Sequence, residues 1–201
     1  MRKLIAEAAR AASGGNLQPW QVYALTARRS SSSRGKSPKR LPAATRGMWM
    51  PNIRSIRRRR KAARHDARAA IDKAPTSGAL AIDRNDAAAR LNRYKRNYEF
   101  FNAPVALFIA IDRRLGPGQW ADLGGYIHAL MYLARGYGLD TCAQESWARM
   151  HRIVGPFVNM PPEQMLFCAV SIGYGDRAHP ANSFRSPRAE PQEFCRFFGF
   201  D

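Results

Sequence analysis

The 201-residue chain contains few cysteines and no pattern of residues typical of a metal site. Its three cysteines, Cys142, Cys168 and Cys195, lie far apart and form no CxxC or Cys/His spacing. Zinc and iron–sulfur sites need closely grouped ligands, so the spacing argues against them. We therefore expect no metal, and we expect the cysteines to be reduced thiols in the core.

Long apolar runs are also missing. No stretch is apolar over the roughly 20 residues that a membrane-spanning helix requires, and the sequence begins with no recognisable signal peptide. These absences predict a chain with no membrane partner and a cytoplasmic location.

Acidic residues are scarce. The chain has 15 Asp and Glu residues against 33 Lys and Arg residues, for a net charge of +18. Most of the excess lies between residues 28 and 73, which hold 16 basic residues and two acids, so the remainder has the charge of an ordinary enzyme. The segment 28–78 lacks patterned apolar residues and is expected to be a poorly ordered basic interruption of a single domain, 1–201.

A basic module that grips nucleic acid or an anionic membrane is the rival interpretation of this segment. Trp49 is the single aromatic residue between 28 and 73, so the segment offers little stacking surface for bases. Its arginines suit unspecific phosphate contact at most, and we do not expect nucleic acid to be the partner.

The stretch on which the interpretation depends is residues 13–20, SGGNLQPW. It follows an amphipathic run over 1–12, predicted as a helix, and precedes a predicted strand over 21–26. Ser13 and Asn16 offer side-chain hydrogen bonds, and Gly14 and Gly15 allow backbone amides to approach a ligand closely. The alternative is a plain helix cap and turn with Gly14 and Gly15 in left-handed conformations.

Helices and strands alternate in the rest of the chain. Hydrophobic spacing predicts helices over 86–101, 119–136 and 148–159, and apolar β-rich runs predict strands over 103–111 and 164–174.

The stretch AASGGNLQPW, residues 11–20, closely resembles the flavin-contacting turn of the FMN-dependent nitroreductase family. Further segments resemble the same family: GPGQW at 116–120, LDTC at 139–142, GYGD at 173–176, and an Asn-x-x-Arg-x-x-Arg tail at 182–188. The resemblance covers residues 1–26 and 81–201.

The resemblance implies an FMN site built from three segments. Ala12, Ser13, Gly14, Asn16 and Gln18 would contact the flavin of the partner subunit. The backbone of Ala143, Gln144 and Glu145 would face N5 and O4 of the ring, while Ser186 and Arg188 would bind the FMN phosphate. Glu145 has a simpler interpretation as an acid at a helix N-terminus.

The implied fold is α+β, a mostly antiparallel sheet flanked by helices, in an intertwined homodimer with the helix 119–136 at its centre. The implied activity is electron transfer from NAD(P)H through FMN to a small-molecule acceptor, a nitroaromatic, quinone or similar compound. The cofactor carries such chemistry, so we predict no acid, base or nucleophile from the protein. An inactive remnant of the family is a further alternative.

Two departures from the family bear on FMN affinity. The arginine-rich segment that grips the phosphate ahead of the first helix in relatives is missing before Met1, and segment 28–78 does not match. We therefore expect weak FMN binding. A shifted reading frame is a second interpretation of 28–78, because permitted codons for 51–58 and 70–78 encode family-like peptides in one common offset.

Overall fold

The computed structural model describes residues 1–26, 80, 82–83, 85–183, 185 and 187–200. These residues belong to two compact units, one formed by 1–26 with 94–175 and the other by the described residues of 80–93 with those of 176–200. The basic segment 28–78 lies outside the described residues, and so do the predictions about its order and its reading frame.

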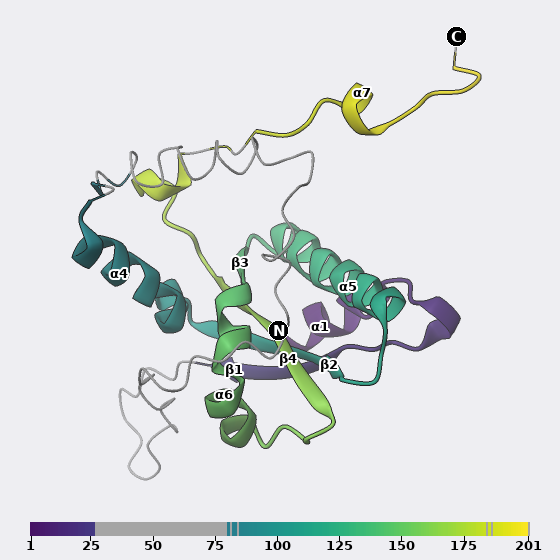
Figure 1. Cartoon of the computed structure of the whole chain (residues 1–201), viewed down its shortest axis with the longest axis horizontal. Helices are drawn as coiled ribbons and strands as arrows, with labels where there is room; N and C mark the ends of the chain where they lie inside the picture. The colour runs from purple at the N-terminus through teal and green to yellow at the C-terminus, as the bar shows by residue number, and fades with distance from the viewer. Residues whose placement is uncertain (27–79, 81, 84, 184, 186, 201) are drawn as a thin grey trace. The chain divides into compact units, whose positions relative to one another are not determined.

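The first unit contains a four-stranded sheet in the order β1-β2-β4-β3 (Figure 1). Its strands are β1 (Gln21–Thr26), β2 (Val105–Asp112), β3 (Asp140–Gln144) and β4 (Gln164–Gly173). Every pairing is antiparallel, with Gln21 opposite Ala110, Val105 opposite Ile172, and Gln144 opposite Ala169. The prediction of an α+β fold with a mostly antiparallel sheet is confirmed.

Both faces of the central strand β2 are buried, because its apolar residues occupy consecutive positions rather than alternate ones. Leu107, Ile109 and Ile111 face one core cluster, which they share with α1 (Arg2–Ala8) and α5 (Pro117–Gly136). Phe108 faces a second cluster, formed with η5 (Glu145–Met150) and α6 (His151–Val158). The sheet is thus covered on both sides, with α1 and α5 together and α6 apart from them (Figure 1).

In the part of the chain that the structure describes, the remaining helical elements are η1 (Gly14–Asn16), α4 (Ala87–Lys95), η4 (Arg96–Asn102), η6 (Pro180–Asn182) and α7 (Pro191–Phe194). The last two belong to the second unit, where the Asp176 carboxylate and carbonyl accept hydrogen bonds from Ala178 N and Asn182 Nδ2. Within the described residues, no helix is both long and apolar enough to cross a membrane.

Several predicted boundaries were wrong. The first helix ends at Ala8 rather than at residue 12, since Arg10 and Ala11 bond to carbonyls only three residues back. The helix predicted over 86–101 is an α-helix only to Lys95. The one predicted over 148–159 is α-helical only from His151, after the 3₁₀ turns of η5. The short strand β3 was not predicted.

The cysteine prediction holds in part. All three cysteines are free, and Cys168 is buried in β4, whereas Cys142 is exposed and Cys195 is only partly buried. Cys142 is exposed because β3 is an edge strand, which covers its side chains less completely than a central strand does.

Gly173, at the end of β4, lies too close to Pro104 to accept a larger side chain. A Cβ built there would lie 2.7 Å from Cδ of Pro104, which real Cβ contacts do not tolerate. Gly173→Ala should lower the free energy of unfolding by about 1–3 kcal/mol, measured by urea denaturation. The control Gly118→Ala, in α5 with open space around its Cβ, should keep or slightly raise stability. Equal stability of the two variants would contradict the close approach.

Candidate functional site

The turn between α1 and β1, residues Ser13–Gln18, is held by its own side chains. We call it the amino-terminal turn. The Ser13 hydroxyl accepts a hydrogen bond from Gln18 N at 3.0 Å, and the carboxamide of Gln18 donates to Asn16 Oδ1 at 3.1 Å. Asn16 N also donates to the Ser13 carbonyl. Three of the five predicted flavin contacts in this part of the chain therefore form one network.

The backbone of this turn is left-handed at Gly15, Asn16 and Gln18, with φ of 57°, 56° and 47°. Asparagine tolerates this region, but glutamine adopts it rarely, so the turn carries local strain that its hydrogen bonds offset. Gly14 is not left-handed, which corrects the simple turn interpretation. The turn bulges outward and leaves Leu17 58% exposed.

The amino-terminal turn is tied to α5 by one side chain. The Asp122 carboxylate accepts a hydrogen bond from Gly14 N at 3.1 Å, over 108 residues of sequence. The sequence offered no signal for this contact, because Asp122 lies inside a helix and far from the turn along the chain. Ala12, the remaining predicted contact here, is exposed between α1 and the turn.

The second candidate segment is residues Ala143–Ser146, where the chain leaves β3. We call it the β3 exit. Ala143 and Glu145 are exposed, and Gln144 between them is only 2% exposed. The Gln144 side chain donates to the Asn97 carbonyl at 2.7 Å, so it points into the protein. The predicted role of the segment, mainly a backbone one, stays a prediction.

One chain does not bring the two segments together. The amino-terminal turn leads into β1 and the β3 exit ends β3, and these strands are the two outer strands of the sheet. With β2 and β4 between them and strands about 4.8 Å apart, their axes are separated by about 14 Å. In the described part of one chain, the two segments therefore lie at opposite edges of the sheet.

The third predicted segment belongs to the second unit. Ser186 lies outside the described residues, and the Arg188 guanidinium donates to the Pro187 carbonyl at 3.0 Å. The phosphate role of both residues stays a prediction.

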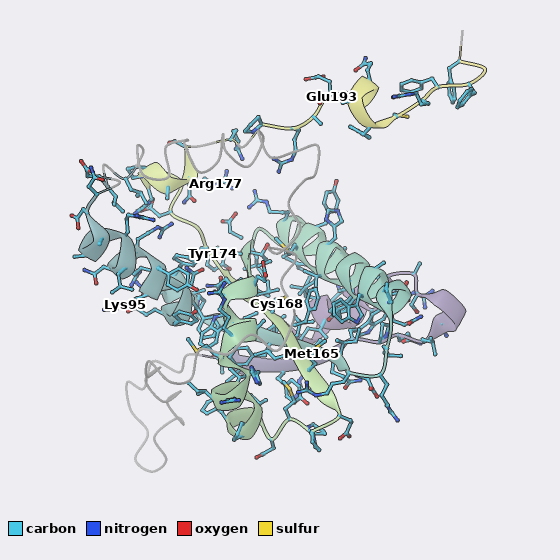
Figure 2. All side chains as sticks on the ribbon, viewed as in Figure 1. Lys95, Met165, Cys168, Tyr174, Arg177 and Glu193 are labelled. Carbon is cyan, nitrogen blue, oxygen red and sulfur yellow. The ribbon has the colours of Figure 1, made fainter. Side chains whose placement is uncertain are left out.

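Burial shifts the pKa values of three side chains, those of Cys168, Tyr126 and His151. Cys168, in the middle of β4 (Figure 2), has its thiol pKa raised to about 12, mainly by burial and also by the negative charge of Glu145. Burial likewise raises the pKa of Tyr126 to about 12 and lowers that of His151. All three are therefore uncharged at neutral pH, and Cys168 does not act as a thiolate nucleophile. Within the described residues, no group of three or more His, Cys, Asp or Glu side chains is arranged to hold a metal ion.

The model of the Nitroreductase family matches residues 1–174, and the matched range runs across the basic segment. The chain is 34% identical to a 4-nitrobenzoate reductase of Pseudomonas putida over 212 residues, covering 100% of this chain and 88% of that protein. It is 29% identical to a nitrobenzene nitroreductase of Ectopseudomonas oleovorans, covering 98% of this chain and 86% of that one.

A solved structure, that of the FMN and NADPH-dependent nitroreductase NfnB from Sphigopyxis sp. strain HMH, superposes with a TM-score of 0.82 at 29% identity. The match covers 99% of this chain and 88% of that one. The FMN-dependent nitroreductase NfnB from Mycobacterium smegmatis shares the fold at 20% identity, with a TM-score of 0.78 and 98% and 87% of the two chains covered.

Removing the Asp122 carboxylate tests how the amino-terminal turn is held. Asp122→Ala deletes the acceptor for Gly14 N and should lower the free energy of unfolding by about 0.5–1.5 kcal/mol. Backbone amides of residues 13–18 should then exchange with deuterium faster, measured by mass spectrometry. Asp122→Asn keeps an acceptor oxygen and should stay close to the parent protein. If both variants exchange alike, the contact does not hold the turn.

Proposed function

The chain belongs to the nitroreductase family, and on that premise we propose that it is an FMN-dependent oxidoreductase that transfers electrons from NAD(P)H to a nitroaromatic or similar acceptor. The observation that carries the proposal is the family match over residues 1–174, which includes both candidate segments. The relatives named as nitrobenzoate and nitrobenzene reductases favour nitroaromatic compounds as the acceptor class.

The residues present fit a flavin. An isoalloxazine ring offers several acceptor atoms and one N–H donor, so it needs mixed polar groups rather than charges. At the β3 exit, Ser146 Oγ is buried, has no hydrogen-bond partner within the described residues, and directly follows the exposed Glu145. The amino-terminal turn adds the Ser13 hydroxyl and the Asn16 carboxamide, which supply donors and acceptors.

The protein's own contribution is to hold and orient. Bound FMN supplies the two-electron transfer, and the backbone amides of the β3 exit would donate hydrogen bonds to the ring edge. Each reduction of a nitro group to a nitroso group consumes two electrons and two protons and releases water. NAD(P)H supplies the electrons with one proton, and solvent supplies the second. No side chain is required to act as acid or base.

A homodimer completes this site in the proposal. Because β1 and β3 lie on opposite edges of the sheet, the amino-terminal turn of one subunit would meet the β3 exit of its partner. The exposed face of α5 suits a close contact between copies, since it carries small residues followed by two stacked rings: Ala121, Gly124, Gly125, His128 and Tyr132. Tyr132 is 75% exposed in the single chain.

The carboxyl-terminal residues add a second apolar surface. Phe194, Phe197, Phe198 and Phe200 are between 57% and 84% exposed, more apolar side chain than a tail normally presents to water. We include in the proposal that this segment packs on the partner subunit. Ser186 and Arg188, just before it, would bind the FMN phosphate, and the reliance on NAD(P)H suits a cytoplasmic location.

Flavin binding tests the function. The purified protein should be yellow or bind added FMN, followed by quenching of flavin fluorescence, and should oxidise NAD(P)H in the presence of 4-nitrobenzoate. Asn16→Gly deletes the carboxamide at a left-handed position without adding strain, and it should weaken FMN binding about tenfold or more, since one hydrogen bond to the ring is worth roughly 1.4 kcal/mol.

The matched control is Asn159→Gly, at the left-handed cap of α6, with φ of 51°. It should bind FMN as the parent does. A colourless protein that binds no FMN but binds DNA in a salt-sensitive manner would instead support the basic module.

Mixing two defective chains tests the shared site. Glu145→Pro removes the backbone N–H at the start of η5, a position where proline is tolerated. If a site takes its turn from one subunit and its β3 exit from the other, mixed dimers of Asn16→Gly and Glu145→Pro chains contain one intact site each. Co-refolding equal amounts should restore about a quarter of the parental activity. No recovery above the separate variants would place both segments in one subunit's site.

A further inference from the structure

One backbone carbonyl accepts hydrogen bonds from two side chains, one within the β3 exit and one directly after it. The carbonyl of Asn97, in η4, accepts a hydrogen bond from Gln144 Nε2 at 2.7 Å and another from Trp147 Nε1 at 3.1 Å. A carbonyl oxygen has two lone pairs, so both bonds are made in full. The two donors stand on either side of Glu145 and Ser146, and this short segment is thus anchored at both ends to the same atom.

η4 ends in left-handed backbone, a few residues after the Asn97 carbonyl that accepts these two hydrogen bonds. Residues Phe100, Phe101 and Asn102 all have positive φ, of 50°, 52° and 64°. Three consecutive non-glycine residues in this region carry strain, and an ordinary helix continuing through them would have used the Asn97 carbonyl for its own ladder. Stacking of Phe100 on the Trp147 ring, 4.6 Å between centroids and 12° between planes, offsets part of that strain.

Burying the polar side chain of Gln144 at this position costs free energy. It is 2% exposed and lies between two exposed neighbours, so its side chain enters the core. The amide orientation follows from chemistry, because a carbonyl facing the Asn97 carbonyl at 2.7 Å would repel it. An apolar side chain of the same size would fill the space without this cost. A polar side chain at this position therefore has a use other than filling the core.

We propose that Gln144 is a positioning residue for the flavin. Its carboxamide, bonded to the Asn97 carbonyl, fixes the rotation of the peptide between Gln144 and Glu145, and so aims the Glu145 N–H outward at the ring edge. This inference rests on the proposed function, which places FMN against the β3 exit. Trp147 fixes the far end of the segment through the same carbonyl. Loss of the Gln144 hydrogen bond alone therefore frees one end of the segment without unfolding the segment.

Three variants separate positioning from packing. Gln144→Met keeps the volume and removes the hydrogen bond, while Trp147 still satisfies the Asn97 carbonyl. Gln144→Glu is a conditional variant: its neutral carboxylic acid can donate to that carbonyl at low pH, and its carboxylate repels it at high pH. Gln164→Met is the matched control, since it removes another glutamine hydrogen bond, from the Tyr23 hydroxyl, at the start of β4.

Deuterium exchange of residues 144–150, measured in the protein without FMN, is the first readout. Gln144→Met should exchange at least tenfold faster there, with a melting temperature within about 4 °C of the parent. The exchange rates of Gln144→Glu should match those of the parent near pH 5 and those of Gln144→Met near pH 8. The parent protein carries the same nearby ionisable groups, Glu145, Arg149 and Tyr98. The pH dependence of its exchange rates, corrected for intrinsic exchange, is therefore the baseline.

FMN affinity by fluorescence titration is the second readout. Gln144→Met should bind FMN about tenfold more weakly and Gln164→Met as the parent does. The inference would be overturned if Gln144→Met had the exchange rates and FMN affinity of the parent. If the methionine variant does not fold, pH-independent exchange in Gln144→Glu would overturn it instead. Failure of the parent protein itself to bind FMN would overturn the proposed function, and the inference with it, so the two failures are distinguished.

Discussion

The burial of β2 on both faces is the constraint on which the rest of the structure depends. Residues Ala106–Ile111 are six consecutive buried positions. A strand of this kind must be covered from two sides, which α1 and α5 do on one face and η5 with α6 do on the other. It must also be paired along both edges, which β1 and β4 do. Everything that binds a ligand in the proposal is therefore displaced from the centre of the sheet.

This displacement explains why the candidate site is divided. The amino-terminal turn precedes one outer strand and the β3 exit follows the other, with the two central strands β2 and β4 between them. An outer strand has one unpaired edge and one half-covered face, which suits contact with a second copy. The sheet topology is thus compatible with the homodimer that we propose.

Both candidate segments depend on backbone conformations that cost energy locally. The amino-terminal turn uses left-handed residues at Asn16 and Gln18, and the segment that supports the β3 exit uses them from Phe100 to Asn102. In each case side-chain hydrogen bonds or ring stacking supply the compensation. Strain of this kind collects at functional sites because the surrounding structure must specify a geometry that propensity alone would not give.

The sequence by itself determined the apolar strands, the long helix α5 and the polar turn at residues 13–18, because these depend on local spacing and composition. It did not reveal where 3₁₀ turns replace helix, since Tyr98 and Phe101 continue the helical spacing of Tyr94, although the backbone is left-handed at Phe101. Nor did it reveal β3, whose five residues carry no alternation and which forms because β4 offers a free edge. Only the tertiary structure decided that Asp122 holds Gly14 and that Asn97 holds Gln144, because these bonds join residues 108 and 47 positions apart. Contacts at such separations depend on how elements pack, and no local pattern in the chain encodes them.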